Sequence, residues 1–300
     1  MVGPEARRPH PIALIVVPHL EWENRPDIDQ PVLVAAFAGW NDAGDAATTA
    51  ADYLIRRWGD GRLARIDPDP FYDFTTHRPL IRLVDGTERE LTWPENDLVL
   101  VRPDSGPDMV VINGVEPHLG WRTFTDTILT AAEELNCRMV ITLGALLAEV
   151  HHHRPVSVVG TSTDPALSDR LGLQPSSYEG PTGIVGVLQY EARHAGYDAI
   201  SLWAAVPTYV PNATSPKAAL ALLQRLVDLI EIPFAATDLQ IAASAYERQV
   251  TSLLEQDEDV ARYAARIEAE QASEGGIEVE PGTGEELIEE VEQFLRDQRE

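Results

Sequence analysis

A strand, a glycine turn and a helix start follow one another near residue 40, and they form the sharpest chemical feature of the sequence. The apolar run 32–37 leads into Gly39, Asn41 and Asp42, and an Ala- and Thr-rich helix pattern follows. In open α/β sheets, ligands bind in crevices beyond the carboxyl ends of strands, so this turn could hold a polar ligand. Acids in the first turn of a helix also complement its dipole and discourage a phosphate. Polar binding and helix capping therefore both remain open for this turn.

A second turn begins at Gly180 and is the better candidate for binding an anion. Thr182 can cap the helix that follows, and the first turn of that helix lacks acids. Gly183 and Gly186 let the backbone approach a ligand, so free N–H groups would point at a bound anion. The glycines are spaced GxxGxxG, which is not the dinucleotide pattern GxGxxG. Close packing of the helix against a strand is the alternative role of these glycines.

Histidine and lysine positions offer two further candidates. His151, His152 and His153 are consecutive and cannot all face one ion, so a surface or interface cluster is the simpler interpretation and no metal is predicted. Lys217 is the only lysine, and it lies in the first turn of a helix that begins Ser-Pro, where a cation is mildly unfavourable. We therefore expect a carboxylate or a ligand to pair with Lys217.

Several motifs of widespread enzyme classes do not occur in the sequence. It contains no GxxxxGK[ST], GxSxG, HExxH or CxxC. Their absence disfavours the common nucleotide hydrolases, serine esterases and zinc proteases, whose chemistry depends on those spacings. No catalytic residue is identified, and no cofactor is predicted.

The turns described above must be positioned by regular secondary structure. Up to residue 235, short β-rich runs alternate with helical patterns. Several runs are apolar throughout, as in strands that are covered on both faces. The predicted strands are residues 12–17, 32–37, 98–101, 109–112, 139–143, 156–161 and 199–204, and the predicted helices are residues 43–58, 121–136, 183–195 and 216–230. This alternation predicts an α/β fold with a three-layer core and a largely parallel sheet. The composition of residues 60–97 predicts an irregular excursion or a hairpin.

A change of character after residue 235 predicts a core domain, residues 1–235, and a C-terminal helical appendage, residues 236–300. A capping box at Thr237 begins a long helical pattern with a break near Asp257. Its apolar stripe consists of Tyr246, Val250, Leu253, Val260, Ala264 and Ile267. A Gly- and Glu-rich acidic linker, residues 273–284, precedes a last helix with Leu287, Val291 and Phe294 on one face. We expect that helix to dock, because so short a helix is not stable alone.

Charge and composition exclude several kinds of partner. The 300 residues include 49 Asp or Glu and 23 Lys or Arg, and the net charge of −26 repels nucleic acids and anionic membranes. The longest apolar run is about half of a membrane span, and no secretion signal is recognised. The single cysteine, Cys137, excludes an internal disulfide. We expect a cytoplasmic, acidic protein that binds neither nucleic acid nor membrane.

The order of several segments along the chain is a further feature. They are residues 37–44 (FAGWNDAG), Glu116-Pro117 with Trp121 and Phe124, residues 144–147 leading to 154–156, and residues 180–186, 201–207 and 216–218. Together they resemble the bacterial proteasome assembly chaperone family over nearly the whole chain. The resemblance implies a nucleoside-phosphorylase-like α/β core, C-terminal helices, self-association, and His152 as the histidine that fits the family pattern. Some relatives carry an ATP-grasp-like label, which a single lysine and a missing phosphate loop do not support.

Two departures from the family pattern bear on function. The sequence ends Gln298-Arg299-Glu300, where assembly chaperones of the family carry a hydrophobic-Tyr-any docking signature. Thr208 stands where similar bacterial sequences are expected to carry histidine. We therefore expect docking through that signature to be missing, and we assign no chemistry to residue 208.

Two functions are compatible with these features. The first is a non-enzymatic, self-associating assembly or interaction factor whose partners are copies of itself and, by the resemblance, proteasome-related proteins. The second is an enzyme or sensor for a small anionic ligand such as a nucleoside, phosphate or carboxylate. That ligand would lie in a cleft between the turns at Gly39 and Gly180, with Arg154 as the counter-charge. The other candidate residues of this cleft are Asn41, Asp42, Glu116, His152, Thr182 and Gly183.

Overall fold

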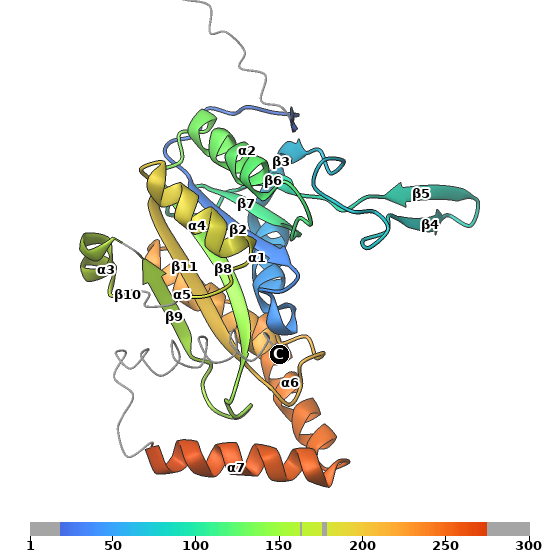
Figure 1. Cartoon of the computed structure of the whole chain (residues 1–300), viewed down its shortest axis with the longest axis vertical. Helices are drawn as coiled ribbons and strands as arrows, with labels where there is room; N and C mark the ends of the chain where they lie inside the picture. Colours follow the sequence, from blue (N-terminus) through green and yellow to red (C-terminus); the bar gives the residue numbers. More distant parts are fainter. Residues whose placement is uncertain (1–18, 163, 176–178, 275–300) are drawn as a thin grey trace, which may run out of the picture.

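The structure, a computed structural model, describes residues 19–162, 164–175 and 179–274. Its centre is a nine-stranded sheet with the order β1-β3-β6-β7-β2-β8-β11-β9-β10 (Figure 1). The strands are β1 (Leu20–Trp22), β2 (Val32–Ala38), β3 (Gly59–Ile66), β6 (Asp97–Val101), β7 (Met109–Val115), β8 (Met139–Ala148), β9 (Val158–Ser162), β10 (Gln174–Pro175) and β11 (Asp198–Pro207).

The middle of the sheet is parallel and its flanks are largely antiparallel. Strands β7, β2, β8 and β11 run in one direction. On one side β6, β3 and β1 add to them in antiparallel pairs, and on the other side β9 pairs antiparallel with β11. The central strands β2 and β8 are buried along almost their whole length, which explains their apolar sequences.

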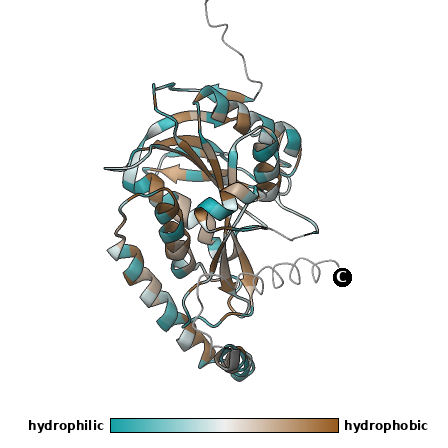
Figure 2. Cartoon of the chain, turned by 90° about the vertical axis from the view of Figure 1, so that its left-hand side faces the viewer, coloured by the Kyte–Doolittle hydropathy of each residue, from teal (hydrophilic) through white to brown (hydrophobic). Residues whose placement is uncertain are grey.

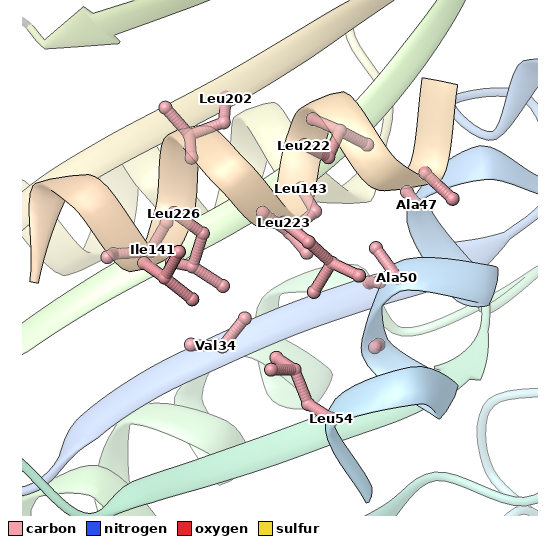
Figure 3. Packing of buried hydrophobic residues seen from close by; sticks show 14 of the residues in the cluster. Val34, Ala47, Ala50, Leu54, Ile141, Leu143, Leu202, Leu222, Leu223 and Leu226 are labelled. Atoms are coloured by element: carbon pink, nitrogen blue, oxygen red, sulfur yellow. The ribbon is translucent and has the colours of Figure 1, made fainter. Parts of the chain in front are cut away.

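Two helices cover each face of the sheet, so the predicted three-layer α/β core is confirmed. Helices α1 (Ala46–Trp58) and α5 (Pro216–Leu229) pack on one face, and α2 (Trp121–Glu134) and α4 (Ile184–His194) pack on the other. Ala47 and Ala50 are small enough to bring α1 close to Val34 of β2 and to Leu223 of α5 (Figure 3). In Figure 2 the strands are mostly hydrophobic, while the surrounding helices alternate hydrophobic and hydrophilic residues, as amphipathic helices do.

Most of the predicted elements coincide with observed ones, and the differences have local causes. The predicted strand at residues 12–17 lies outside the described residues. Strand β3 was not predicted, because its first half is exposed and only its second half carries buried residues. The short helix α3 (Pro165–Leu171) was not predicted either; Asp164 caps it by accepting the N–H groups of Ala166 and Leu167.

Two helices continue the chain beyond the core, namely α6 (Thr237–Leu254) and α7 (Glu258–Glu274) (Figure 1). The predicted break is confirmed: Asp257 Oδ1 accepts the N–H groups of Asp259 and Val260, at 3.0 and 3.2 Å, and so starts α7. The predicted capping box is wrong, because Thr237 is already helical and Ala236 occupies the N-cap position. No helix in the described ranges is both long and apolar enough to cross a bilayer.

The stripe predicted for these helices is buried in part. Tyr246 and Val250 of α6 and Ala264 and Ile267 of α7 are buried, whereas half of Leu253 is exposed. The last predicted helix, with Leu287, Val291 and Phe294, lies outside the described residues.

Of the two alternatives left open for residues 60–97, an irregular excursion or a hairpin, the hairpin is present at residues 80–92. Strands β4 (Leu80–Val84) and β5 (Glu88–Thr92) form a two-stranded antiparallel sheet of their own, which extends away from the body of the molecule (Figure 1). Their turn includes Asp85 and Gly86, both with positive φ, as tight hairpin turns require. Every residue of both strands is exposed to solvent.

Candidate functional site

The turn after β2 and the end of β7 meet at the point of the sheet where ligand sites are expected. These two strands are parallel neighbours, and the helices that follow them, α1 and α2, cover opposite faces of the sheet. In other open α/β sheets, ligands bind in a crevice beyond the carboxyl ends of strands at such a point. Gly39 and Trp40 follow β2 there, and Glu116 follows β7.

The carboxylate of Glu116 joins the two turns that the sequence singled out. Its Oε1 accepts the backbone N–H of Ile184 at 2.9 Å, and its Oε2 accepts the backbone N–H of Trp40 at 3.4 Å. Ile184 is the first residue of α4, so the bond lies at the positive end of that helix dipole. The acid that the sequence of α4 lacks in its first turn is thus supplied by a residue 68 positions away. The protein places its own carboxylate where an external anion was expected.

Gly183 allows these groups to come together. It stands at the N-cap of α4, and a Cβ at this position would lie 1.7 Å from Asn41 Oδ1 and 2.9 Å from Glu116 Oε1. Gly39 has a φ of 141°, and its Cβ would lie 3.0 Å from the Cβ of Glu116. Gly183 therefore serves close packing, which was the alternative role of these glycines. Its neighbours are the polar side chains of Asn41 and Glu116 and not a strand.

Thr182 does not have its predicted capping role. Gly183 is the N-cap residue of α4, and no side chain at that position bonds to the helix amides. Glu116 already accepts the N–H of Ile184. Thr182 is exposed, and its hydroxyl lies where a Cβ of Gly186 would be. Gly180 is exposed in the preceding turn.

Asp42 serves the start of α1. Its Oδ1 accepts the N–H of Ala47 at 2.7 Å and that of Thr48 at 3.3 Å, and its Oδ2 accepts the hydroxyl of Thr48. Burial raises the pKa of this carboxyl group, against the effect of those hydrogen bonds. The sequence left polar binding and helix capping open for this turn. The hydrogen bonds in the structure are those of helix capping.

A cavity of about 330 Å³ lies beside the first turn. Its lining residues are Gly39, Trp40, Asp42, Ala43, Gly44, Asp45, Leu146, Leu147, Pro211 and Asn212. The lining includes two carboxylates and neither lysine nor arginine, so its charge disfavours an anion.

His152 and Arg154 belong to a different part of the molecule. They follow β8 and line a narrow crevice together with Lys217 and Tyr246, whereas neither residue lines the cavity at Gly39. The side chain of Arg154 is exposed, and its backbone carbonyl accepts a hydrogen bond from Lys217. The nine predicted site residues therefore divide into two groups, and the structure does not bring Arg154 to the two turns as a counter-charge.

Lys217 is paired by a carboxylate, which is one of the two outcomes expected from the sequence. Its Nζ lies 2.6 Å from Oε1 of Glu247 on α6, and it donates to the carbonyl oxygens of His152 and Arg154 at 2.6 and 2.7 Å. The side chain is only 15% exposed. One ammonium group thus joins α5, α6 and the loop after β8.

His152 is buried against α6, and besides the bond from Lys217 to its carbonyl oxygen it makes three hydrogen bonds. Its Nδ1 and its N–H both lie within 2.9 Å of the Tyr209 hydroxyl, and its Nε2 lies 3.0 Å from Oγ1 of Thr251. Three partners in this crevice could not be identified from the sequence, because they lie far along the chain from the histidines and belong to no recognisable motif. They are Tyr209, Thr251 and Glu247. Among the described residues, no group of three or more His, Cys, Asp or Glu side chains is arranged to hold a metal ion.

Acid is expected to weaken the contact between His152 and α6. Burial lowers the pKa of His152 from 6.5 to about 4, and the charges of His153, His151 and Lys217 act in the same direction. Between these two pH values the unfolded chain binds a proton at this position and the folded chain does not. The contribution of neutral His152 to stability is therefore fully present above pH 6.5 and falls towards pH 4, by at most ~1.4 kcal/mol for each pH unit.

Urea unfolding of the wild type and of His152→Gln between pH 7 and pH 4 measures this effect. We expect a smaller loss of stability in the variant, since it has no imidazole to protonate. His194→Gln is the control, because His194 is exposed at the end of α4. Equal pH slopes for the wild type and His152→Gln would show that His152 is not responsible.

Comparison with known proteins identifies the relatives of the chain. Residues 36–254 match the model of the PAC2 family. A PAC2 family protein from Streptomyces avermitilis is 46% identical, with a TM-score of 0.72 over 78% of this chain and 99% of that one. A proteasome-assembly chaperone homologue from Mycobacterium tuberculosis is 45% identical, with a TM-score of 0.70 over 77% of this chain and 99% of that one.

A third solved structure matches almost the full length. It is a Mycobacterium tuberculosis protein of unknown function, 26% identical, with a TM-score of 0.80 over 98% of this chain and all of that one. No curated protein matches the sequence. The family model covers more than two thirds of the chain, and two relatives are well above 30% identical, so the chain belongs to the PAC2 family.

Proposed function

We propose that this chain is a non-enzymatic, self-associating assembly factor that acts on proteasome-related proteins in the cytoplasm. Its membership of the PAC2 family and its 45% identity to a proteasome-assembly chaperone homologue support an assembly-chaperone-like role. The observation that carries the proposal is the β4–β5 hairpin, which extends away from the body of the molecule (Figure 1). Its large apolar side chains are exposed to solvent. Exposed apolar surface of this kind is typical of protein-binding sites.

The interior of the candidate site supports the same function. The positive end of α4 is neutralised by Glu116, and the neighbouring cavity carries the carboxylates of Asp42 and Asp45. An enzyme for a small anion would need donors that are free to stabilise charge on its substrate. Here the donor at the start of α4 already has an internal partner.

An assembly experiment tests the proposal. The purified chain is mixed with proteasome subunits of the same organism, and native mass spectrometry follows both complexes with the chain and the rate at which proteasome particles form. We expect a complex with assembly intermediates and faster particle formation. Absence of any complex, together with an unchanged assembly rate, would contradict the proposal.

A sensor for a small anion is the second candidate, because the site lies where open α/β sheets bind ligands. We expect the wild type to show no phosphate-dependent shift of the Gly183 and Ile184 amide signals at low millimolar phosphate, since Glu116 occupies the position. Glu116→Ala frees the N–H of Ile184 and is expected to produce such shifts.

NMR titration with phosphate measures the difference. Glu133→Ala is the matched control, because it removes the same charge from an exposed position on α2. Phosphate shifts at Ile184 in the wild type would favour the sensor over the assembly factor. Equal shifts in the Glu116 and Glu133 variants would attribute binding to net charge.

A further inference from the structure

The cavity beside the turn at Gly39 lies where the carboxyl ends of three neighbouring parallel strands meet. Trp40 follows β2, Leu147 lies near the end of β8, and Asn212 follows β11. Ligand sites of open α/β sheets lie at this edge. The cavity volume of about 330 Å³ falls within the range of roughly 300–1,000 Å³ that is usual for small-molecule sites. Position and size are therefore those of a ligand site.

The lining of this cavity suits a ligand that carries a positive charge on an apolar stem. Trp40 and Leu146 are apolar lining residues, whereas Asp42, Asp45 and Asn212 are polar ones. Among the described lining residues there is no lysine, arginine or histidine. Aromatic rings and carboxylates are the groups that recognise ammonium and guanidinium ions in proteins.

The carboxylate of Asp42 is buried beside a second negative charge. Only 7% of this residue is exposed, and the described donors to its carboxylate are neutral, namely the N–H groups of Ala47 and Thr48 and the Thr48 hydroxyl. Burial raises the pKa of Asp42, and the charge of Asp45 acts in the same direction. Buried charges in proteins are usually paired with an opposite charge. A cation in the cavity would supply that opposite charge.

Asp45 is held in place at the rim of the cavity. It stands at the N-cap position of α1 and is exposed to solvent. Its Oδ2 accepts the hydroxyl of Thr214 at 2.8 Å, which joins the turn after β2 to the loop after β11. A bond to Oδ2 positions the carboxylate without neutralising it, so Asp45 keeps its charge for a ligand.

We propose that this cavity binds a small organic cation, that is, an ammonium or guanidinium group on a short apolar stem. Asp42 and Asp45 supply the opposite charge, and Trp40 supplies aromatic surface. The net charge of −26 raises the concentration of such cations near the protein. This site does not depend on the assembly role in the proposed function. It also takes a ligand of the opposite charge to the anion expected at the two turns.

NMR titration of the full chain with n-butylammonium chloride tests the site. 1-Butanol and sodium butyrate are matched probes, because they carry a neutral or a negative group on a similar stem. We expect n-butylammonium to shift the amide signals of Trp40, Asp45 and Asn212 at low millimolar concentration. The other two probes are expected to leave these signals unchanged.

Three variants show whether the charge and the aromatic ring act as proposed. Asp45→Asn removes the charge, whereas asparagine tolerates the φ of 48° and can still accept the Thr214 hydroxyl, so we expect binding at least about tenfold weaker. Trp40→Leu is expected to weaken binding about two- to fivefold. Asp69→Asn is the control, because it removes the same charge from an exposed turn after β3, and its affinity should stay within about twofold of the wild type.

The contrary outcomes are distinct from failure of the assembly role. Equal weakening in the Asp45 and Asp69 variants would attribute binding to net charge and overturn the site. Equal shifts with 1-butanol would show that the cavity selects the stem and not the cation. A Gly-Lys-Gly peptide that binds at least about tenfold more tightly than n-butylammonium would assign the cavity to a lysine side chain of a partner protein. Faster proteasome assembly by both the wild type and Asp45→Asn would leave the two functions separate.

Discussion

Replacing Lys217 by Met is expected to lower the free energy of unfolding by about 3 kcal/mol, near the lower end of the range for breaking one side of a buried ion pair. The variant leaves the carboxylate of Glu247 without its cation and removes the donor of the carbonyl oxygens of His152 and Arg154. The loss falls at the lower end because about a third of the Glu247 side chain remains exposed to water. Urea unfolding gives the total loss, and hydrogen exchange in α6 and in residues 151–154 locates it.

Two further variants make this result specific. Arg248→Met removes a cation from an exposed position next to Glu247 and is expected to change stability by less than about 0.5 kcal/mol. Lys217→Met combined with Glu247→Gln should recover part of the loss, because the unpaired charge is gone. Lys217→Met with unchanged exchange in α6 would mean that the ion pair does not hold this helix to the loop.

Substituting Gly183 by Ala is expected to lower the free energy of unfolding by about 2 to 5 kcal/mol. The new methyl group would overlap Asn41 Oδ1 and press on Glu116 Oε1, and overpacking of this kind costs about 1–3 kcal/mol. Displacing Glu116 also breaks its bond to the N–H of Ile184, which adds roughly 1–2 kcal/mol. Thermal and urea unfolding measure the loss, and the amide signals of Trp40 and Ile184 report whether Glu116 has moved.

Two comparisons test that explanation. Gly186→Ala faces only the exposed and movable Thr182 side chain, and alanine favours a helix by about 0.5–1 kcal/mol over glycine, so this variant is expected to be neutral or slightly stabilising. Gly183→Ala combined with Asn41→Ala should be more stable than Gly183→Ala alone. A double variant that is less stable still would show that the overlap with Asn41 is not the cause.

The core could be predicted from the sequence, because its signals are local. Strands β2 and β8 are largely apolar runs, as expected for strands that are covered on both faces. Helices α1, α2, α4 and α5 carry apolar residues at helical spacing. Strand β3 was missed because half of it faces water, and the capping box at Thr237 was misassigned by one residue at a helix start. The break near Asp257 was predicted, and the hairpin was one of two alternatives for residues 60–97, which are rich in Asp, Pro, Thr and Arg.

The candidate site could be predicted only in part, because it depends on contacts between distant segments. The sequence identified the turns at Gly39 and Gly183 as special, but it does not show that Glu116 lies between them and fills the position of an anion. It also grouped His152 and Arg154 with these turns, whereas they lie in a separate crevice with Lys217. The sequence shows which residue types are present and how they are spaced along the chain. Only the order of the strands in the sheet shows which of these residues lie close together.

The position of Lys217 has a consequence for the fate of the protein in a cell. It is the only side chain with a primary amine, and in the folded chain it is largely buried and hydrogen-bonded to Glu247, His152 and Arg154. Acetylation, or the attachment of a degradation tag to a lysine side chain, requires a free and accessible amine. The folded chain therefore withholds its one lysine from such enzymes, and local opening of α6 exposes it. Tagging at this residue would then report on unfolding, so damaged copies would be marked while intact copies are spared.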